Sequence, residues 1–129
     1  MSRKKIQIKR AYEPAVPEDG ERYLVDRLWP RGVKKDALVL TGWLKEIAPS
    51  NSLRRWFGHD PARWTEFRRR YRGKLKSQRT ALQSLREALK RGPVTLVYSA
   101  HDESHNQAVV LREFLLKPSS TSRRQDRRD

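Results

Sequence analysis

Residues 94–99, with the sequence VTLVYS, limit the possible folds of this chain more than any other feature. The stretch is almost continuously apolar, rich in β-branched residues, and enclosed between Pro93 and His101. A helix of ordinary length does not fit into so short a span, whereas a strand that is buried on both faces does. The stretch therefore predicts a central strand and argues against an all-helical fold.

Two further stretches, residues 6–10 and 22–26, have the β-rich composition of strands. Helical signals fill the chain between the second stretch and the central strand. The apolar positions of the predicted helices are Leu40, Trp43, Leu44 and Ile47 (ended by Pro49); Leu53, Trp56 and Phe57 (capped by Ser50, ended by Gly58); Trp64, Phe67, Tyr71 and Leu75 (begun at Asp60-Pro61); and Leu82, Leu85 and Leu89 (ended by Gly92-Pro93). A last helix is predicted to begin near Ser104. This order predicts a small single α/β domain with a mainly parallel sheet of three to four strands and helices packed around it.

The domain is predicted to span residues 1–117, because residues 118–129 contain no hydrophobic side chain and have the composition of a disordered basic tail. The chain carries 30 Lys and Arg against 15 Asp and Glu, a formal net charge of +15. An excess of this size attracts polyanions, so the expected partner is an anionic small molecule or a nucleic acid. No apolar run is long enough for a membrane span or a signal peptide, and we expect a cytoplasmic protein.

Polar side chains stand at the end of every predicted strand. In open α/β sheets ligands bind beyond the carboxyl ends of the strands, where parallel strands would bring these groups into one crevice. Arginine binds phosphate or carboxylate oxygens with a fork of N–H donors, and the start of the last helix would add backbone N–H groups. We therefore predict an anion-binding crevice for a phosphorylated or nucleotide-like ligand. Its residues are Arg10, Asp26, Arg27, Trp29 and Arg31, supported by Arg54, His59, Ser99 and Asn106.

Several of these side chains also have a plainer interpretation. Asp26 would pair with an arginine inside the fold, and Trp29 would pack over a sheet edge. Asn106 stands where it would cap the last helix, and His59 stands at a helix junction where a capping or packing role is common. His59 is the candidate acid or base if it reaches the crevice, because histidine exchanges protons near neutral pH.

The sequence gives no sign of a metal or cofactor. The absence of cysteine excludes disulfides, thiolate catalysis and cysteine-ligated metals. His101 and His105, with Asp102, straddle a loop-to-helix boundary that breaks the spacing needed for metal ligation, so no metal is predicted. Ser99 lacks the flanking glycines of a nucleophile elbow, and neither a P-loop nor a GxGxxG loop occurs, so no cofactor is predicted. Whether the protein is an enzyme stays open at this point.

Residues 68–79 (RRRYRGKLKSQR) favour a different function. The stretch contains seven basic residues and no acid: Arg68, Arg69, Arg70, Arg72, Lys74, Lys76 and Arg79. A helix face of that charge density can neutralise several phosphates without reading bases, so a non-enzymatic, sequence-independent nucleic-acid-binding module is the alternative function. The plainer interpretation is a solvated helix face. A protein-interaction domain is a third possibility.

Four motifs appear along the chain: KRAYEP, DGERYLVDRLWPRGVKK, WLKEIAPSNSLRRWFGHDPARWTEFRRRY and VTLVYSAHDESHNQAVVLREFL. In this order they resemble the YeaO-like proteins, part of the family called domain of unknown function 488, over residues 6–116. The most specific parts are DRLWPRG and LRRWFGHDP. The resemblance implies a compact cytoplasmic α/β domain but no particular reaction. Its signature positions include the candidate residues Arg10, Asp26, Arg27, Trp29, Arg31, Arg54, His59 and Asn106.

Overall fold

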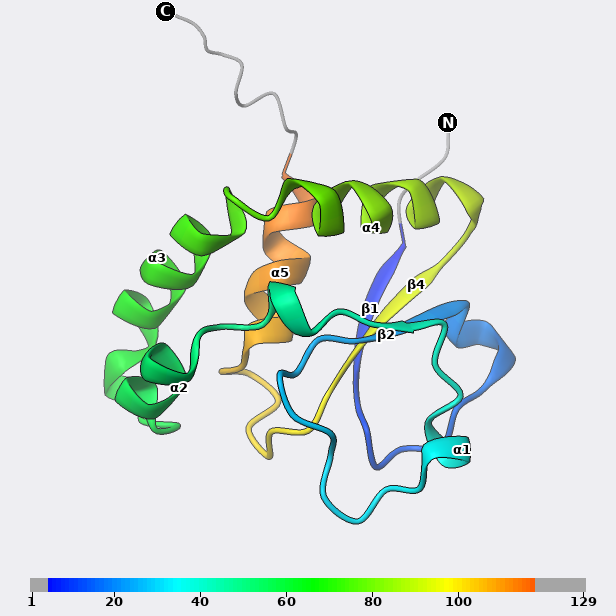
Figure 1. Cartoon of the computed structure of the whole chain (residues 1–129), viewed down its shortest axis with the longest axis horizontal. Coiled ribbons are helices and arrows are strands. Elements are labelled where there is room, and N and C mark those ends of the chain that lie inside the picture. Colours follow the sequence, from blue (N-terminus) through cyan, green and yellow to red (C-terminus); the bar gives the residue numbers. More distant parts are fainter. Residues whose placement is uncertain (1–4, 118–129) are drawn as a thin grey trace, which may run out of the picture.

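The computed structural model describes residues 5–117; the predicted basic tail, residues 118–129, lies outside this part (Figure 1). The strands are β1 (Ile6–Arg10), β2 (Glu21–Leu24), β3 (Gly42–Trp43) and β4 (Val94–Tyr98). The α-helices are α1 (Lys35–Leu38), α2 (Asn51–Phe57), α3 (Trp64–Leu75), α4 (Arg79–Arg91) and α5 (Gln107–Leu116). Short 3-10 helices lie at Pro17–Asp19, Lys45–Ile47 and Pro61–Arg63.

The four strands form one parallel sheet in the order β1-β4-β2-β3. β4 pairs with β1 on one side and β2 on the other, and all five of its residues are buried. This placement explains its unbroken apolar sequence, because a central strand covered on both faces has no solvent side. The predicted α/β fold with a mainly parallel sheet is confirmed.

The two faces of the sheet are covered differently. Helices α3, α4 and α5 pack together over one face with the larger core, which includes Tyr23, Leu96 and Tyr98 (Figure 1). The opposite face holds a smaller cluster, in which Leu24 and Val97 pack beneath α1 and the loops that flank it. Successive residues of β2 and β4 thus enter opposite cores, because neighbouring side chains of a strand point to opposite faces of the sheet.

The helix ends follow the local signals in the sequence. The Ser50 hydroxyl accepts the Leu53 N–H at 3.1 Å and caps α2, which ends at Gly58 in the left-handed conformation with φ of 52°. The Asp60 carboxylate likewise accepts the Ala62 N–H at 3.0 Å ahead of α3. No helix within residues 5–117 has the length and apolar character needed to cross a lipid bilayer.

The helix predicted over Leu40, Trp43, Leu44 and Ile47 is wrong. The chain there adds the edge strand β3 to β2 and then turns into the 3-10 helix Lys45–Ile47. Main-chain hydrogen bonds from Thr41 N to Arg22 O and from Leu44 N to Leu24 O hold this edge. Leu40 and Trp43 enter the smaller cluster while Leu44 and Ile47 enter the larger core. Apolar spacing typical of a helix therefore arises from a chain that crosses the sheet edge.

The last helix begins at Gln107, three residues later than predicted, with Asn106 as its N-cap. Asp102 Oδ1 accepts the N–H groups of Ser104 and His105, at 2.9 and 3.0 Å, and holds this segment as a turn. Such a side-chain turn gives these N–H groups an acceptor without a helix. β2 and β4 also end earlier than the predicted strands, at Leu24 and Tyr98.

Candidate functional site

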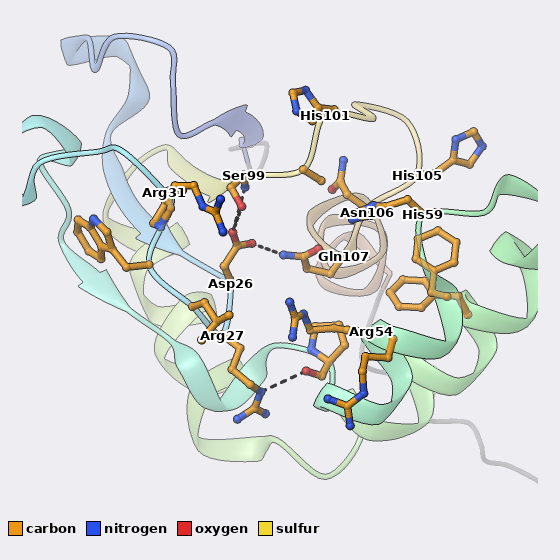
Figure 2. Close-up of a pocket in the computed structure, with 18 of the residues that line it drawn as sticks. Asp26, Arg27, Arg31, Arg54, His59, Ser99, His101, His105, Asn106 and Gln107 are labelled. Carbon is orange, nitrogen blue, oxygen red and sulfur yellow. Dashed lines mark hydrogen bonds between the residues drawn. The ribbon is translucent and has the colours of Figure 1, made fainter.

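A pocket of about 420 Å³ opens beyond the carboxyl ends of β2 and β4 (Figure 2). Most of its lining comes from the segment after β2, from α2 and the turn after it, and from the segment between β4 and α5. Parallel strands deliver the residues that follow them to one sheet edge, which explains why distant parts of the sequence meet here. The predicted site residues that line the pocket are Asp26, Arg27, Trp29, Arg31, Arg54, His59, Ser99 and Asn106.

Asp26 lies in the middle of the pocket and is held by neutral donors (Figure 2). Its Oδ2 accepts the backbone N–H of Ser99 at 3.0 Å and the Ser99 hydroxyl at 2.5 Å, and its Oδ1 accepts the side-chain amide of Gln107. Burial raises the pKa of Asp26, although these hydrogen bonds and the charge of Arg54 act in the opposite direction. Asp26 forms no ion pair within residues 5–117, so no arginine of this part neutralises it by direct contact.

Four arginines surround this single acid in the lining: Arg27, Arg31, Arg54 and Arg55. Arg27 Nε donates to the Pro49 carbonyl at 3.3 Å, and Arg54 Nη1 donates to Asn51 Oδ1 at 3.0 Å. Arg31 and Arg55 differ from these two: their guanidinium groups make no hydrogen bond and no ion pair with the described residues. The pocket therefore holds positive charge that the fold itself does not use.

Arg10 is the predicted site residue that the structure places outside the lining. Its Nε donates to the Ala100 carbonyl at 2.9 Å and its Nη2 to the Ser99 carbonyl at 3.3 Å. Its guanidinium also lies over the ring of Tyr12, 5.0 Å from the ring centre. Arg10 thus fixes the main chain that leaves β4, and it supports the pocket rather than facing it.

Trp29 forms part of the wall and is anchored on its far side. Its indole N–H donates to the Val33 carbonyl at 2.7 Å, and its ring meets Trp43 edge to face with 5.4 Å between ring centres. The Tyr12 hydroxyl donates to the Arg31 carbonyl at 3.1 Å and ties down the same loop. These contacts tie the loop after β2 to Tyr12 and Trp43.

His59 reaches the pocket lining but is not oriented by a partner. It follows Gly58 and is itself in the left-handed region, with φ of 58°. Its ring lies 6.1 Å from the ring of Phe57 and makes no hydrogen bond to the described residues. The residue is exposed, so the predicted acid or base is present at the pocket without the neighbour that would fix its proton.

The side chain of Asn106 is used by the fold. Its Oδ1 accepts the Val109 N–H at 3.1 Å and caps α5, while its Nδ2 donates to the Asp102 carbonyl at 2.8 Å. It is only 2% exposed. Of the two roles expected for Asn106, capping and ligand binding, the structure shows capping, and little of the amide remains available to a ligand.

Arg55 and Gln107 are among the lining residues that the sequence did not predict for the site. Arg55 adjoins Arg54 in LRRWF, and the sequence alone does not show that both face the pocket. Gln107 is the first residue of α5, and its role depends on the approach of Asp26 from β2, 81 positions away in the chain. The one signal that could have pointed to Arg55 and Gln107 is the predicted meeting of the strand ends at one edge of the sheet.

His105 is oriented by a carboxylate. Its Nδ1 lies 2.9 Å from Asp102 Oδ2, and its ring meets Trp64 edge to face at 5.1 Å between ring centres. Figure 2 shows His101 and His105 at the edge of the pocket, away from Asp26. Residues 5–117 contain no group of three or more histidine, aspartate or glutamate side chains arranged to hold a metal ion.

The basic stretch 68–79 lies mostly on α3, where several of its charges are paired. Arg68 Nη2 lies 2.6 Å from a carboxylate oxygen of Glu113, and both Arg69 and Arg70 bind Glu66, at 2.6 and 2.7 Å. Lys74, a further member of the stretch, donates to the Ala48 carbonyl. The remaining predicted residues of this surface are Arg72, Lys76 and Arg79. Two acids outside the stretch, Glu66 and Glu113, therefore pair with three of its seven basic residues.

Comparison with known proteins identifies the family of this chain. The sequence family described as "Inactive DUF488-N3 subclade" matches residues 5–129. "Uncharacterized protein YeaO" of Escherichia coli is 44% identical over 110 residues, which cover 85% of this chain and 96% of that protein. "Uncharacterized protein Rv3073c" of Mycobacterium tuberculosis is 40% identical over 111 residues, which cover 86% of this chain and 93% of that protein. No solved structure matches. The chain therefore belongs to the YeaO-like family, domain of unknown function 488.

Proposed function

We propose that this protein binds a phosphorylated or nucleotide-like anion in the pocket beyond β2 and β4. The observation that carries the proposal is the imbalance of charge in the lining, where four arginines face one aspartate. Arg31 and Arg55 are not engaged by the described residues, and a guanidinium group can bind two phosphate oxygens in a fork. Cations gathered in a concave site also concentrate anions from solution.

The rest of the lining suits the uncharged part of such a ligand. Trp29, Phe57 and Phe67 supply aromatic surface, and the prolines Pro30 and Pro49 add apolar surface. A volume of about 420 Å³ lies within the range of sites that hold small molecules, about 300–1,000 Å³. The combination of free cations and aromatic walls is typical of a site for an organic phosphate rather than for inorganic phosphate alone.

The site supports binding more strongly than catalysis. A general base acts from a fixed position within hydrogen-bond reach of its proton, and His59 has no partner to hold it there. Asp26 is enclosed by Ser99 and Gln107, and within residues 5–117 it forms no hydrogen bond with a histidine. The description of the matching family as inactive supports the same choice. We propose that His59 contributes to ligand contact rather than to proton transfer.

The alternative, a nucleic-acid-binding module built on residues 68–79, has weaker support. Three arginines of this surface already bind glutamates, so a polyanion would have to displace those carboxylates first. Counterion release on binding, which drives such association, would be correspondingly smaller. A polyanion is therefore kept as a ligand in the test rather than as a second proposal.

The test is isothermal titration of the full chain with ribose 5-phosphate and, separately, with single-stranded DNA as a polynucleotide, each at low and high salt. Wild type is compared with Arg31→Ala/Arg55→Ala and with the matched control Arg69→Ala/Arg70→Ala, which removes the same charge from α3. We expect the pocket variant to bind at least roughly tenfold more weakly and the control to bind as wild type does. Equal weakening in both variants, or binding only of a polynucleotide, would overturn the proposal.

A further inference from the structure

The floor of the pocket is built from hydrogen-bond acceptors. We call Asp26, Ser99 and Gln107 the acceptor floor; these side chains are linked in one network (Figure 2). The Gln107 amide nitrogen approaches Asp26 Oδ1 and lies 3.4 Å from the Val25 carbonyl oxygen. Because a carboxylate and a carbonyl only accept, the nitrogen must face them, and the orientation of the amide is fixed.

The acceptor floor has unused accepting capacity. Asp26 Oδ2 receives two hydrogen bonds from Ser99, but Oδ1 receives only the one from Gln107, and a carboxylate oxygen can accept two. Gln107 Oε1 has no partner within residues 5–117, and it is not among the atoms that are buried without one. Both residues line the pocket. Gln107 Oε1 can therefore accept from a ligand, and Asp26, which is 8% exposed, has the second lone pair of Oδ1 beside it.

The donors of the acceptor floor, in contrast, are consumed. Both hydrogens of the Gln107 amide are directed at Asp26 and Val25, and the Ser99 hydroxyl hydrogen is directed at Asp26. A phosphate placed on the floor would find acceptors and a carboxylate, both of which repel it. The phosphate belongs with Arg31 and Arg55, and another part of the ligand must meet the floor.

We infer that the ligand carries an N–H donor in addition to its anionic group, and that Asp26 and Gln107 select it. The class that combines a phosphate, a flat apolar body and such a donor is a nucleoside monophosphate with an exocyclic amino group on the base. The amino group meets the acceptor floor, the base lies against the aromatic wall, and the phosphate binds the free arginines. This inference rests on the proposed function and adds the identity of the ligand's uncharged part.

The preference for an amino-bearing base follows from the hydrogen bonds that Asp26 and Gln107 can accept. A base that lacks the amino group leaves the free lone pairs of Asp26 and Gln107 out of contact with water and without a donor. Sites built to hydrogen-bond a group reject analogues that lack it far more strongly than apolar sites reject an extra methylene. One hydrogen bond to a charged acceptor corresponds to about 10- to 100-fold in affinity.

The test uses nucleotide pairs that differ by one amino group. The full chain is titrated with AMP against purine ribonucleoside monophosphate, GMP against IMP, and CMP against its 4-deamino analogue, with ribose 5-phosphate as the probe without a base. We expect at least one amino nucleotide to bind roughly tenfold or more tightly than its partner. If ribose 5-phosphate binds and no pair differs by more than about threefold, the inference fails and the anion-binding function stands. If neither ribose 5-phosphate nor any nucleotide binds, both fail.

A variant that reverses the polarity of the floor gives a second readout. In Asp26→Asn the new amide oxygen can accept from Ser99, and the new nitrogen can donate to Gln107 Oε1 once that amide turns over. Gln107 then presents its nitrogen to the pocket, so the preference of wild type should shrink or reverse in favour of a carbonyl-bearing base such as that of IMP over AMP. The matched control is Asp36→Asn, the same change at an exposed position of α1. An unchanged preference in a folded Asp26→Asn variant would overturn the role of the acceptor floor.

Discussion

The arginines of the pocket and the arginines of α3 are alike in sequence and different in their surroundings. On α3, Arg68, Arg69 and Arg70 each bind a glutamate, either one turn away on the same helix or across on α5. In the pocket, Arg31 and Arg55 have no such partner within the described residues, and the acid of the lining, Asp26, is held by neutral donors. The comparison teaches that the density of basic residues along a sequence does not locate a binding surface. What matters is the number of acids that the fold brings within reach.

Reversing the pocket charges should have the largest effect. Arg31→Glu/Arg55→Glu replaces two phosphate donors with two repelling carboxylates, and we expect ribose 5-phosphate binding to fall by at least roughly 100-fold. The same reversal in Arg69→Glu/Arg70→Glu should leave that binding within about threefold of wild type. Titration calorimetry of both variants makes the comparison. A loss of similar size in the α3 variant would show that the two sets of arginines act as one surface.

Replacing the acid of the pocket, Asp26, should lower the stability of the fold more than replacing the acid of α3, Glu66. Asp26→Ala leaves the Ser99 N–H, the Ser99 hydroxyl and the Gln107 amide without their buried acceptor, so we expect about 1–3 kcal/mol of destabilisation. Glu66→Ala removes only exposed ion pairs and should leave the unfolding midpoint in urea nearly unchanged. Urea unfolding followed by tryptophan fluorescence measures both. Equal destabilisation by the two changes would contradict the distinction.

The two acids should also titrate in opposite directions. Burial raises the pKa of Asp26 above its usual 3.8, whereas hydrogen bonds from Arg69 and then Arg70 lower the pKa of Glu66 to about 2. The stability linked to Asp26 is therefore present below its usual pKa and is lost as the pH rises through the raised value. The stability linked to Glu66 is present above 4.5 and is lost as the pH falls towards about 2. Carbon-13 NMR of the carboxyl groups between pH 2 and 7 measures both pKa values. A lower pKa for Asp26 than for Glu66 would contradict this prediction.

Freeing the α3 arginines should have the smallest effect. Glu66→Gln removes the charge that neutralises Arg69 and Arg70 while keeping the side-chain shape. Binding of single-stranded DNA at low salt should then rise a few-fold, because more cations can replace counterions, while ribose 5-phosphate binding should not change. Fluorescence anisotropy at two salt concentrations measures the first effect. An unchanged DNA affinity would mean that these pairs do not limit the α3 surface.

Much of the fold was predictable because its signals are local. The run at residues 94–99 predicted a central strand, and the caps at Ser50 and Asp60 predicted where helices begin. The stretch from Leu40 to Ile47 was mispredicted because pairing with β2 outweighed its helical spacing. Helical periodicity reports which residues are buried, and a chain that crosses a sheet edge buries residues at the same spacing.

The candidate site was predictable where it depended on strand ends. Asp26, Arg31 and Ser99 line one pocket because they follow parallel strands of one sheet. Arg10 is the last residue of such a strand, but β1 is an edge strand, and the Arg10 guanidinium turns to the main chain beyond β4. Gln107 could not be identified because its partner lies far away in the sequence. Which arginines are free likewise depends on tertiary contacts that no local pattern contains.

The central claim is that Arg31 and Arg55 of the pocket are free to bind an anion, whereas Arg68, Arg69 and Arg70 of α3 are held by glutamates. The most direct measurement is a titration of arginine-labelled full chain with ribose 5-phosphate, followed by NMR of the guanidinium Nε–H signals assigned through single Arg→Lys variants. The account predicts saturable shifts for Arg31 and Arg55 while the signals of Arg68, Arg69 and Arg70 stay in place. Shifts confined to α3, or no saturable shift at Arg31 and Arg55, would contradict it.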